Sequence, residues 1–125
     1  MNQCVATATR KVCYLAFCYS SGGRAGIKTR QKNLNMADKW GKRLAKQFGW
    51  AIIHPVHNTL YLETTISYEE IIQMDLAIIS RVDLVIFLPG WQKSSGAKKE
   101  LAYCKANNIP YKFWYEVLFE EGEPQ

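Results

Sequence analysis

The segment Val82–Glu100, VDLVIFLPGWQKSSGAKKE, decides the fold. Residues 82–88 are almost all β-branched or otherwise apolar, as is typical of a strand that is covered on both faces in a parallel sheet. Pro89-Gly90 ends this strand. A polar turn follows, and the pattern from about residue 95 to 107 predicts a helix. The segment is therefore a strand, a turn and a helix, the repeating unit of a parallel α/β sheet.

The turn between this strand and this helix is the place where we expect a ligand. Ligands of open α/β sheets bind just beyond the carboxyl ends of the strands. Ser94, Ser95 and Gly96 cap and open the helix, and backbone N–H groups at a helix start suit an anion such as phosphate. Gly90 and Trp91 belong to the same turn. Trp91 either stacks on a base or packs against the protein.

The rest of the chain also alternates strands with helices. We expect strands over residues 11–19, 50–54, 82–88 and 110–116, and helices over 33–48, 67–81 and 95–107. Leu60–Thr65 is a candidate fifth strand. This order predicts an α/β fold, a small doubly wound parallel sheet of four to five strands with helices on both faces, as in flavodoxin-like folds. The 125 residues form one domain, with loosely ordered ends over 1–10 and 117–125.

The charge is distributed unevenly along the chain. The net charge is +5, and residues 1–50 hold ten Lys or Arg side chains and a single acid, Asp38. The basic half is interpreted as a solvated helix face, as an attraction for a small phosphorylated ligand, or as a nucleic-acid surface. Because no basic strand is rich in aromatic residues, nucleic acid is not expected as a partner.

The four cysteines are Cys4, Cys13, Cys18 and Cys104, and none forms a C-x-x-C motif. This usage is typical of buried free thiols in a reducing compartment. No secretory segment opens the chain, and no apolar run reaches membrane-spanning length. The sequence therefore predicts a cytoplasmic protein without a membrane partner.

Asp75 lies where an apolar residue is expected. In the helix SYEEIIQMDLAIISR, isoleucines lie three and four residues from it on either side, which places it on the apolar stripe. Burial of a carboxylate is costly and raises its pKa. Asp75 is therefore either a buried residue that caps a loop or pairs with an arginine, or a site carboxylate that holds a proton near neutral pH.

Glu100 lies near the start of the last helix, at the border of its inward side. The helix N-terminus and the neighbouring Lys98 and Lys99 favour its charged form, so we expect it to be ionised. Taken alone, it is typical of a solvated surface. Paired with Asp75 at one edge of the sheet, it becomes a site candidate. One protonated and one ionised carboxylate is the arrangement that glycosidic chemistry uses.

His54 and His57 follow the second predicted strand in the sequence HPVHN. Two histidines without a third ligand are weak grounds for a metal site. We therefore expect a structural or loop role for them, and assign no metal.

Three features occur here in the order found in a known family. Tyr14 opens Tyr-Leu-Ala-Phe in the first strand, Asp75 lies in a mid-chain helix, and Pro89-Gly-Trp precedes Ser94-Ser-Gly-Ala-Lys-Lys-Glu100. On these residues the chain resembles the nucleoside 2-deoxyribosyltransferase superfamily over about residues 11–115. The PGW-x-x-S-x-G-A-x-x-E pattern is similar to that of small bacterial and phage members of unassigned function.

The resemblance implies a flavodoxin-like fold and cleavage of the N-glycosidic bond of a 2-deoxynucleoside or its 5′-monophosphate, without a cofactor. In the family's pattern Glu100 matches the nucleophile that attacks C1′. Asp75 matches the carboxylate that assists proton transfer to the leaving base, and Tyr14 matches the strand tyrosine that orients the nucleophile. A homo-oligomer is implied as well, for which the aromatic segment Tyr111–Tyr115 offers apolar surface.

Ser94 narrows the choice within the superfamily. Transferases that act on free nucleosides carry an acid at this position, whereas the monophosphate N-glycosidases are similar to this chain in carrying Ser. The resemblance thus implies an N-glycosidase for 2′-deoxynucleoside 5′-monophosphates (dNMPs). The alternatives are a base-exchanging deoxyribosyltransferase and a protein that binds a nucleotide without cleaving it. The loop after the first strand is expected to supply further substrate contacts: Phe17, Tyr19, Ser20, Gly22 and Arg24.

Overall fold

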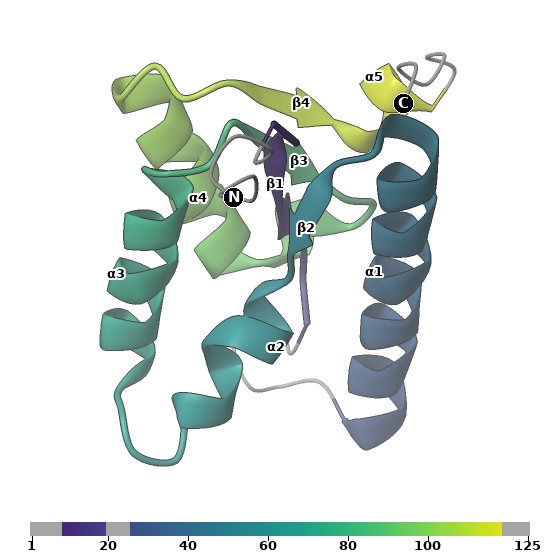
Figure 1. Ribbon diagram of the computed structural model, residues 1–125. Coiled ribbons are helices and arrows are strands. Elements are labelled where there is room, and N and C mark those ends of the chain that lie inside the picture. Colours follow the sequence, from purple (N-terminus) through teal and green to yellow (C-terminus); the bar gives the residue numbers. More distant parts are fainter. Residues whose placement is uncertain (1–8, 20–25, 119–125) are drawn as a thin grey trace, which may run out of the picture.

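The computed structural model describes residues 9–19 and 26–118, which are built around a parallel sheet. Its strands are β1 (Val12–Ala16), β2 (Ala51–Ile53), β3 (Leu84–Phe87) and β4 (Tyr111–Phe113), in the spatial order β2-β1-β3-β4. All neighbouring pairs run parallel. This confirms the predicted small α/β sheet of flavodoxin-like type (Figure 1).

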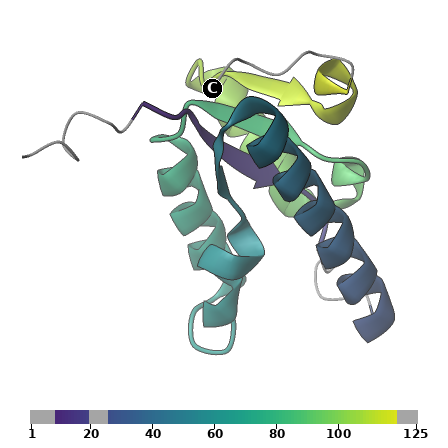
Figure 2. The ribbon, with the colours of Figure 1, turned by 45° about the vertical axis from the view of Figure 1, so that its right-hand side comes forward.

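Helices cover both faces of the sheet. The helices are α1 (Ile27–Phe48), α2 (Pro55–Asn58), α3 (Tyr68–Ile79), α4 (Ser95–Ala106) and α5 (Trp114–Val117), with short 3-10 turns η2 (Leu60–Leu62) and η3 (Trp91–Lys93). The long α1 lies on one side of the strands, while α3 and α4 lie on the other (Figures 1 and 2). Among the helices of the described segments, none is both long enough and apolar enough to cross a membrane.

Two hydrophobic clusters fill the spaces between these layers. Alternate residues of β1 point to opposite faces of the sheet. Cys13 and Leu15 pack in the cluster that includes α1, whereas Tyr14 and Ala16 pack in the cluster that includes residues of α3 and α4. The hydroxyl of Tyr14 is therefore directed into the layer that supplies the two candidate carboxylates.

Local signals end α1 and begin α3 in the predicted way. Gly49 ends α1 in the left-handed conformation, with φ of 74°, which glycine adopts without a Cβ clash. Ser67 caps α3, because its hydroxyl accepts a hydrogen bond from the N–H of Glu70 at 3.2 Å. Helix α1 differs from the prediction at its other end and begins at Ile27 rather than at residue 33.

The prediction of a fifth strand in Leu60–Thr65 is wrong. Pro55 starts α2 at the first helical position, where its fixed φ is favourable. The N–H of Thr59 then bonds to the carbonyl of Pro55, and the N–H of Leu62 bonds to the carbonyl of Thr59. Because these backbone hydrogen bonds are satisfied locally, the segment forms turns and needs no partner strand.

The last predicted strand is also shorter than expected. β4 ends at Phe113 and the chain turns into α5, whose Val117 is 1% exposed and packs in the cluster with α1. The expected loose end over 117–125 therefore does not include Val117. Residues 1–8 and 119–125 lie outside the described part of the chain.

Candidate active site

A pocket lies beyond the carboxyl ends of β1, β2 and β3, where the fold predicts a ligand. Its walls are the residues after β1, the helix α2 with the turn behind it, one side of α3, and the first turns of α4. The predicted site residues that line it are Phe17, Tyr19, Asp75, Ser94, Gly96 and Glu100.

Tyr14 connects the sheet to the first carboxylate. It is fully buried in β1, and its hydroxyl donates a hydrogen bond to Oε2 of Glu100 at 2.6 Å. Burial, and then the charges of Glu100 and Asp75, raise the pKa of Tyr14 well above its usual value. The phenol therefore keeps its proton and acts as a donor at any ordinary pH.

Asp75 is the second carboxylate in the pocket. It is 5% exposed, and its Oδ1 accepts a hydrogen bond from the hydroxyl of Thr59 at 2.6 Å. Burial raises the pKa of Asp75 to about 6, although the hydrogen bonds from Thr59 and Tyr14 pull it down. The expected raised pKa is confirmed, and these hydrogen bonds come from hydroxyl groups rather than from an arginine.

The expectation that Glu100 is held in its charged form is wrong. Its side chain is buried on the inner face of α4, while Lys98 and Lys99 are exposed and Lys99 pairs instead with Glu69 at 3.5 Å. Burial therefore dominates and raises the pKa of Glu100 to about 8. The hydrogen bond from Tyr14 lowers this pKa, and the charge of Asp75 raises it.

Asp75 and Glu100 form one coupled pair, because both interact with the hydroxyl of Tyr14 and the charge of Asp75 raises the pKa of Glu100. Between about pH 6 and pH 8 the pair holds a single proton, and the two apparent pKa values belong to the pair rather than to one residue. The pocket thus contains one neutral and one charged carboxyl group near neutral pH.

The start of α4 forms the polar end of the pocket. The hydroxyl of Ser94 caps this helix by accepting a hydrogen bond from the N–H of Ala97 at 3.0 Å. The N–H groups of Ser95 and Gly96 follow the capping residue directly, in the first turn of the helix, where N–H groups have no intrahelical acceptors. These N–H groups and the helix dipole favour an anion here. The hydroxyl of Ser95 lies 3.4 Å from that of Tyr68, at the start of α3.

Two side chains of α3 approach Gly96 closely. A Cβ atom at this position would lie 2.8 Å from the hydroxyl of Tyr68 and 3.0 Å from Cδ1 of Ile72. A larger residue would displace the ends of these two side chains, both of which belong to α3 and line the pocket.

Of the other predicted substrate-binding residues, three that the structure describes do not line this pocket: Gly90, Trp91 and Ser95. Gly90 has a φ of 84° and begins the turn η3. Trp91 stacks on Phe113 with ring centroids 5.4 Å apart and meets the edge of Phe87, so its ring packs against the protein. Ser20, Gly22 and Arg24 lie outside the described residues.

Thr59 and Tyr68 also line the pocket, although neither was predicted from the sequence as a site residue. The role of Thr59 could not be predicted from the sequence, because its contact with Asp75 depends on how α2 and α3 lie relative to each other. Tyr68 follows the capping residue Ser67 directly, so it is a large aromatic residue in the first turn of a helix. Together with Gly96 at the start of the next helix, this was the available sign that Tyr68 lies at the pocket.

Most of the chain matches one known protein family. Residues 16–113 match the family described as Domain of unknown function (DUF4406). No curated protein matches the chain. The matched segment includes Asp75 and Glu100 but begins after Tyr14.

Proposed function

The chain belongs to the DUF4406 family, and we propose that it hydrolyses the N-glycosidic bond of dNMPs, with Glu100 as the nucleophile. The observation that carries this proposal is the meeting of Tyr14, Asp75 and Glu100, far apart in the sequence, at one pocket beside the start of α4. Two carboxyl groups and an anion-binding helix start are the parts that cleavage of a phosphorylated N-glycoside requires.

In the first step, the ionised carboxylate of Glu100 attacks C1′ of the deoxyribose. The bond between C1′ and the base nitrogen breaks, and the base takes the electron pair together with a proton from Asp75. A covalent ester between Glu100 and the sugar results. The positive charge that develops on the sugar ring stabilises the buried Glu100 anion, while the Tyr14 hydroxyl keeps the carboxylate oriented.

In the second step, water attacks C1′ and Asp75, now ionised, takes a proton from that water. The ester bond breaks and returns its electron pair to Glu100, which leaves deoxyribose 5-phosphate as the product. The reaction therefore starts from the singly protonated pair with its proton on Asp75. This form is in equilibrium with the form in which Glu100 carries the proton.

The polar end of the pocket supports the choice of a 5′-phosphate over a free 5′-hydroxyl. Ser94 lines the pocket where the similar transferases carry an acid, and it adds no negative charge beside the start of α4. The pocket is also lined by Phe17, Tyr19 and Val56, whose apolar and aromatic side chains suit the flat face of a base.

The test of this proposal is incubation of the full chain with a panel of dNMPs and the matching deoxynucleosides, followed by chromatography for free base. We expect free base and deoxyribose 5-phosphate from at least one dNMP. Transfer of the sugar to an added second base would show a deoxyribosyltransferase instead. A ligand-induced rise in melting temperature (Tm) without any product would show a nucleotide-binding protein and contradict the catalytic proposal.

A pair of substitutions at Ser94 tests the phosphate assignment. Both Ser94→Asp and Ser94→Asn preserve a good helix cap, but only Asp adds a charge to the pocket. We expect Ser94→Asp to raise KM for dNMPs roughly tenfold or more relative to Ser94→Asn, because like charges a few ångströms apart repel by a few kcal/mol near a protein surface. Equal KM values for the two variants would place the phosphate elsewhere.

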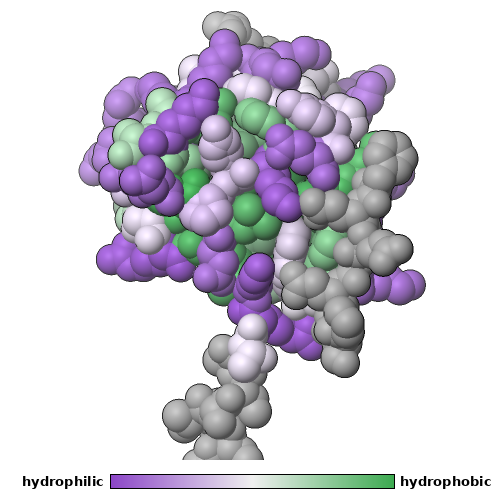
Figure 3. Space-filling model, turned by 90° about the horizontal axis from the view of Figure 1, so that it is seen from above, coloured by the Kyte–Doolittle hydropathy of each residue, from purple (hydrophilic) through white to green (hydrophobic). Residues whose placement is uncertain are grey.

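The proposal includes a homo-oligomer in a reducing cytoplasm. Cys13 and Cys104 are buried free thiols, as a reducing compartment favours. Beyond β4, Tyr115 is 54% exposed and stacks on Phe113. Figure 3 views the molecule from the side on which β4 and α5 lie in Figure 1, and there hydrophobic surface is interspersed with hydrophilic side chains. An interface of mixed character suits such a surface.

A further inference from the structure

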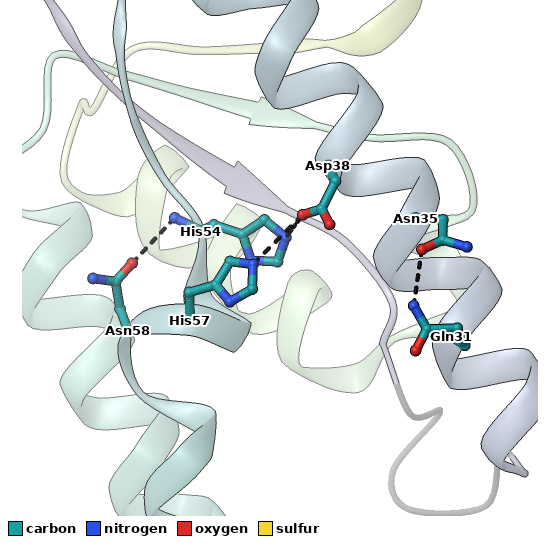
Figure 4. A network of polar contacts seen from close by, with 6 residues as sticks. All are labelled: Gln31, Asn35, Asp38, His54, His57 and Asn58. Atoms are coloured by element: carbon teal, nitrogen blue, oxygen red, sulfur yellow. Dashed lines mark hydrogen bonds and ion pairs between the residues drawn. The ribbon is translucent and has the colours of Figure 1, made fainter.

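A second group of polar side chains lies outside the pocket and has no part in the proposed reaction. It consists of Asp38 on α1, His54 at the end of β2 and His57 on α2 (Figure 4). Nε2 of His54 lies 3.3 Å from Oδ1 of Asp38, and Nε2 of His57 lies 3.5 Å from the same oxygen. The two imidazole rings are 4.4 Å apart between centroids.

His54 is the unusual member of this group. The residue is 7% exposed, yet neither nitrogen of its ring has a hydrogen-bond partner among the described residues. The 3.3 Å approach to Asp38 is close enough for an ion pair, but it is not aligned as a hydrogen bond. Buried polar nitrogens are almost always satisfied, so this ring indicates a ligand that completes its interactions.

His54 is also held in place. Its backbone N–H donates to Oδ1 of Asn58 at 3.1 Å, and its ring meets Phe17 edge-on with centroids 4.9 Å apart. The side chains of His57 and Asp38 are 60% and 38% exposed, so the group opens to solvent on that side. The buried ring of His54 is thus held in place, while the side chains of His57 and Asp38 beside it can adjust and can be reached from solvent.

We propose that Asp38, His54 and His57 bind a divalent transition-metal ion, with Zn²⁺ as the best fit. Two imidazole nitrogens and one carboxylate oxygen are a common donor set for Zn²⁺, with a fourth position left for water. The ligand atoms of the three residues all lie within 4.8 Å of one another. The side chain of His57 is 60% exposed, so its ring has room to adjust toward the ion.

The distances favour a tetrahedral ion over an octahedral one. Ligand atoms at about 2.1 Å from a tetrahedral Zn²⁺ are about 3.4 Å apart, whereas the right angles of an octahedron would bring them to about 3.0 Å. The two nitrogen-to-oxygen distances of 3.3 and 3.5 Å fit the first geometry.

The group lies between α1 and α2, so a bound ion would have a structural role. The ion would join α1 to α2, and α2 with its flanking residues forms a wall of the pocket. Thr59, which ends α2, donates its hydroxyl to Asp75. Metal binding would therefore fix the segment that positions one of the two pocket carboxylates, without taking part in bond cleavage.

The test measures metal binding and does not depend on catalysis. The full chain is stripped with a chelator, dialysed and titrated with Zn²⁺ by calorimetry, and with Co²⁺ by visible absorption. We expect one ion per chain with a Kd at or below about 1 µM, a rise in Tm with Zn²⁺, and intense Co²⁺ bands of tetrahedral type. Because the chain contains two histidines in all, His-dependent binding has no other source.

Variants assign the ion to these ligands. His57→Ala and Asp38→Asn are expected to weaken Zn²⁺ binding at least ~100-fold, and to leave Tm without metal close to that of the parent because both side chains are partly exposed. Glu69→Gln removes an exposed carboxylate elsewhere and should bind Zn²⁺ like the parent. Binding weaker than about 100 µM, or equal binding by His57→Ala and the parent, would overturn the proposal. A failure of dNMP cleavage would leave this result unaffected.

Discussion

Glu100→Gln is expected to lower the rate of base release from dNMPs by roughly 10³-fold or more. An amide cannot form the glycosyl ester, so the first step loses its nucleophile. The replacement keeps the size of the side chain, and its amide oxygen still accepts the hydrogen bond that Tyr14 donates to Glu100. The measurement is chromatographic detection of free base at saturating dNMP, with the Kd of the nucleotide determined by calorimetry and expected to stay within about threefold of the parent value.

The stability of Glu100→Gln supplies the control for folding. Burial raises the pKa of Glu100 from 4.5 to about 8, so the folded protein favours the neutral carboxyl group. This contribution to stability is fully present below pH 4.5 and is lost as the pH rises through about 8. Gln does not titrate and loses nothing. We therefore expect a similar Tm for variant and parent at pH 5, and a higher Tm for the variant at pH 9.

A protein that is inactive and yet more stable at alkaline pH has lost its chemistry rather than its fold. If Glu100→Gln released base at the parental rate, Glu100 could not be the nucleophile. If its Tm at pH 9 were no higher than that of the parent, the buried position of Glu100 would be wrong.

The parts of the fold that follow from short-range patterns could be predicted from the sequence. The apolar run of Leu84–Phe87 is a central strand because it is buried on both faces. Ser67 begins α3 with its own side chain, and Gly49 ends α1 with its own backbone conformation. Both helix ends could therefore be predicted from the sequence. Asp75 was recognisable because a carboxylate among isoleucines at helical spacing has to be buried.

Features that depend on contacts between distant segments could not be predicted in this way. Glu100 is buried because α3 packs closely on α4 at Gly96, and no local pattern measures that distance. The polar segment that contains Thr59 became a turn over the pocket rather than a strand. Asp38 lies beside the two histidines although it belongs to α1, an earlier helix in the chain. The one indication in the sequence that Asp38 is unusual was its position as the single acid among residues 1–50.

Asp75→Asn is expected to lower kcat/KM for dNMPs by about 10²- to 10⁴-fold, the usual contribution of a positioned acid. The parent requires one proton on the carboxyl pair. Its kcat/KM should therefore follow a bell-shaped pH profile with a maximum near pH 7 and limbs near the two pKa values, about 6 and about 8.

Removal of Asp75 changes the shape of this profile as well as its height. Glu100 then titrates alone, and its pKa falls because the charge of Asp75 no longer raises it. We expect activity to rise to a plateau with increasing pH and the alkaline limb to disappear. A dNMP analogue whose base leaves without protonation should recover most of the lost rate, because that substrate does not need the acid.

Thr59→Val provides the matched control for Asp75→Asn. It keeps Asp75 but removes the hydroxyl that donates to it at 2.6 Å, and this hydrogen bond lowers the pKa of Asp75. The acidic limb of the profile should therefore move to higher pH in Thr59→Val, while the bell shape remains. A bell-shaped profile that persists in Asp75→Asn would show that another group supplies the proton, because a pair that has lost one member cannot produce both limbs.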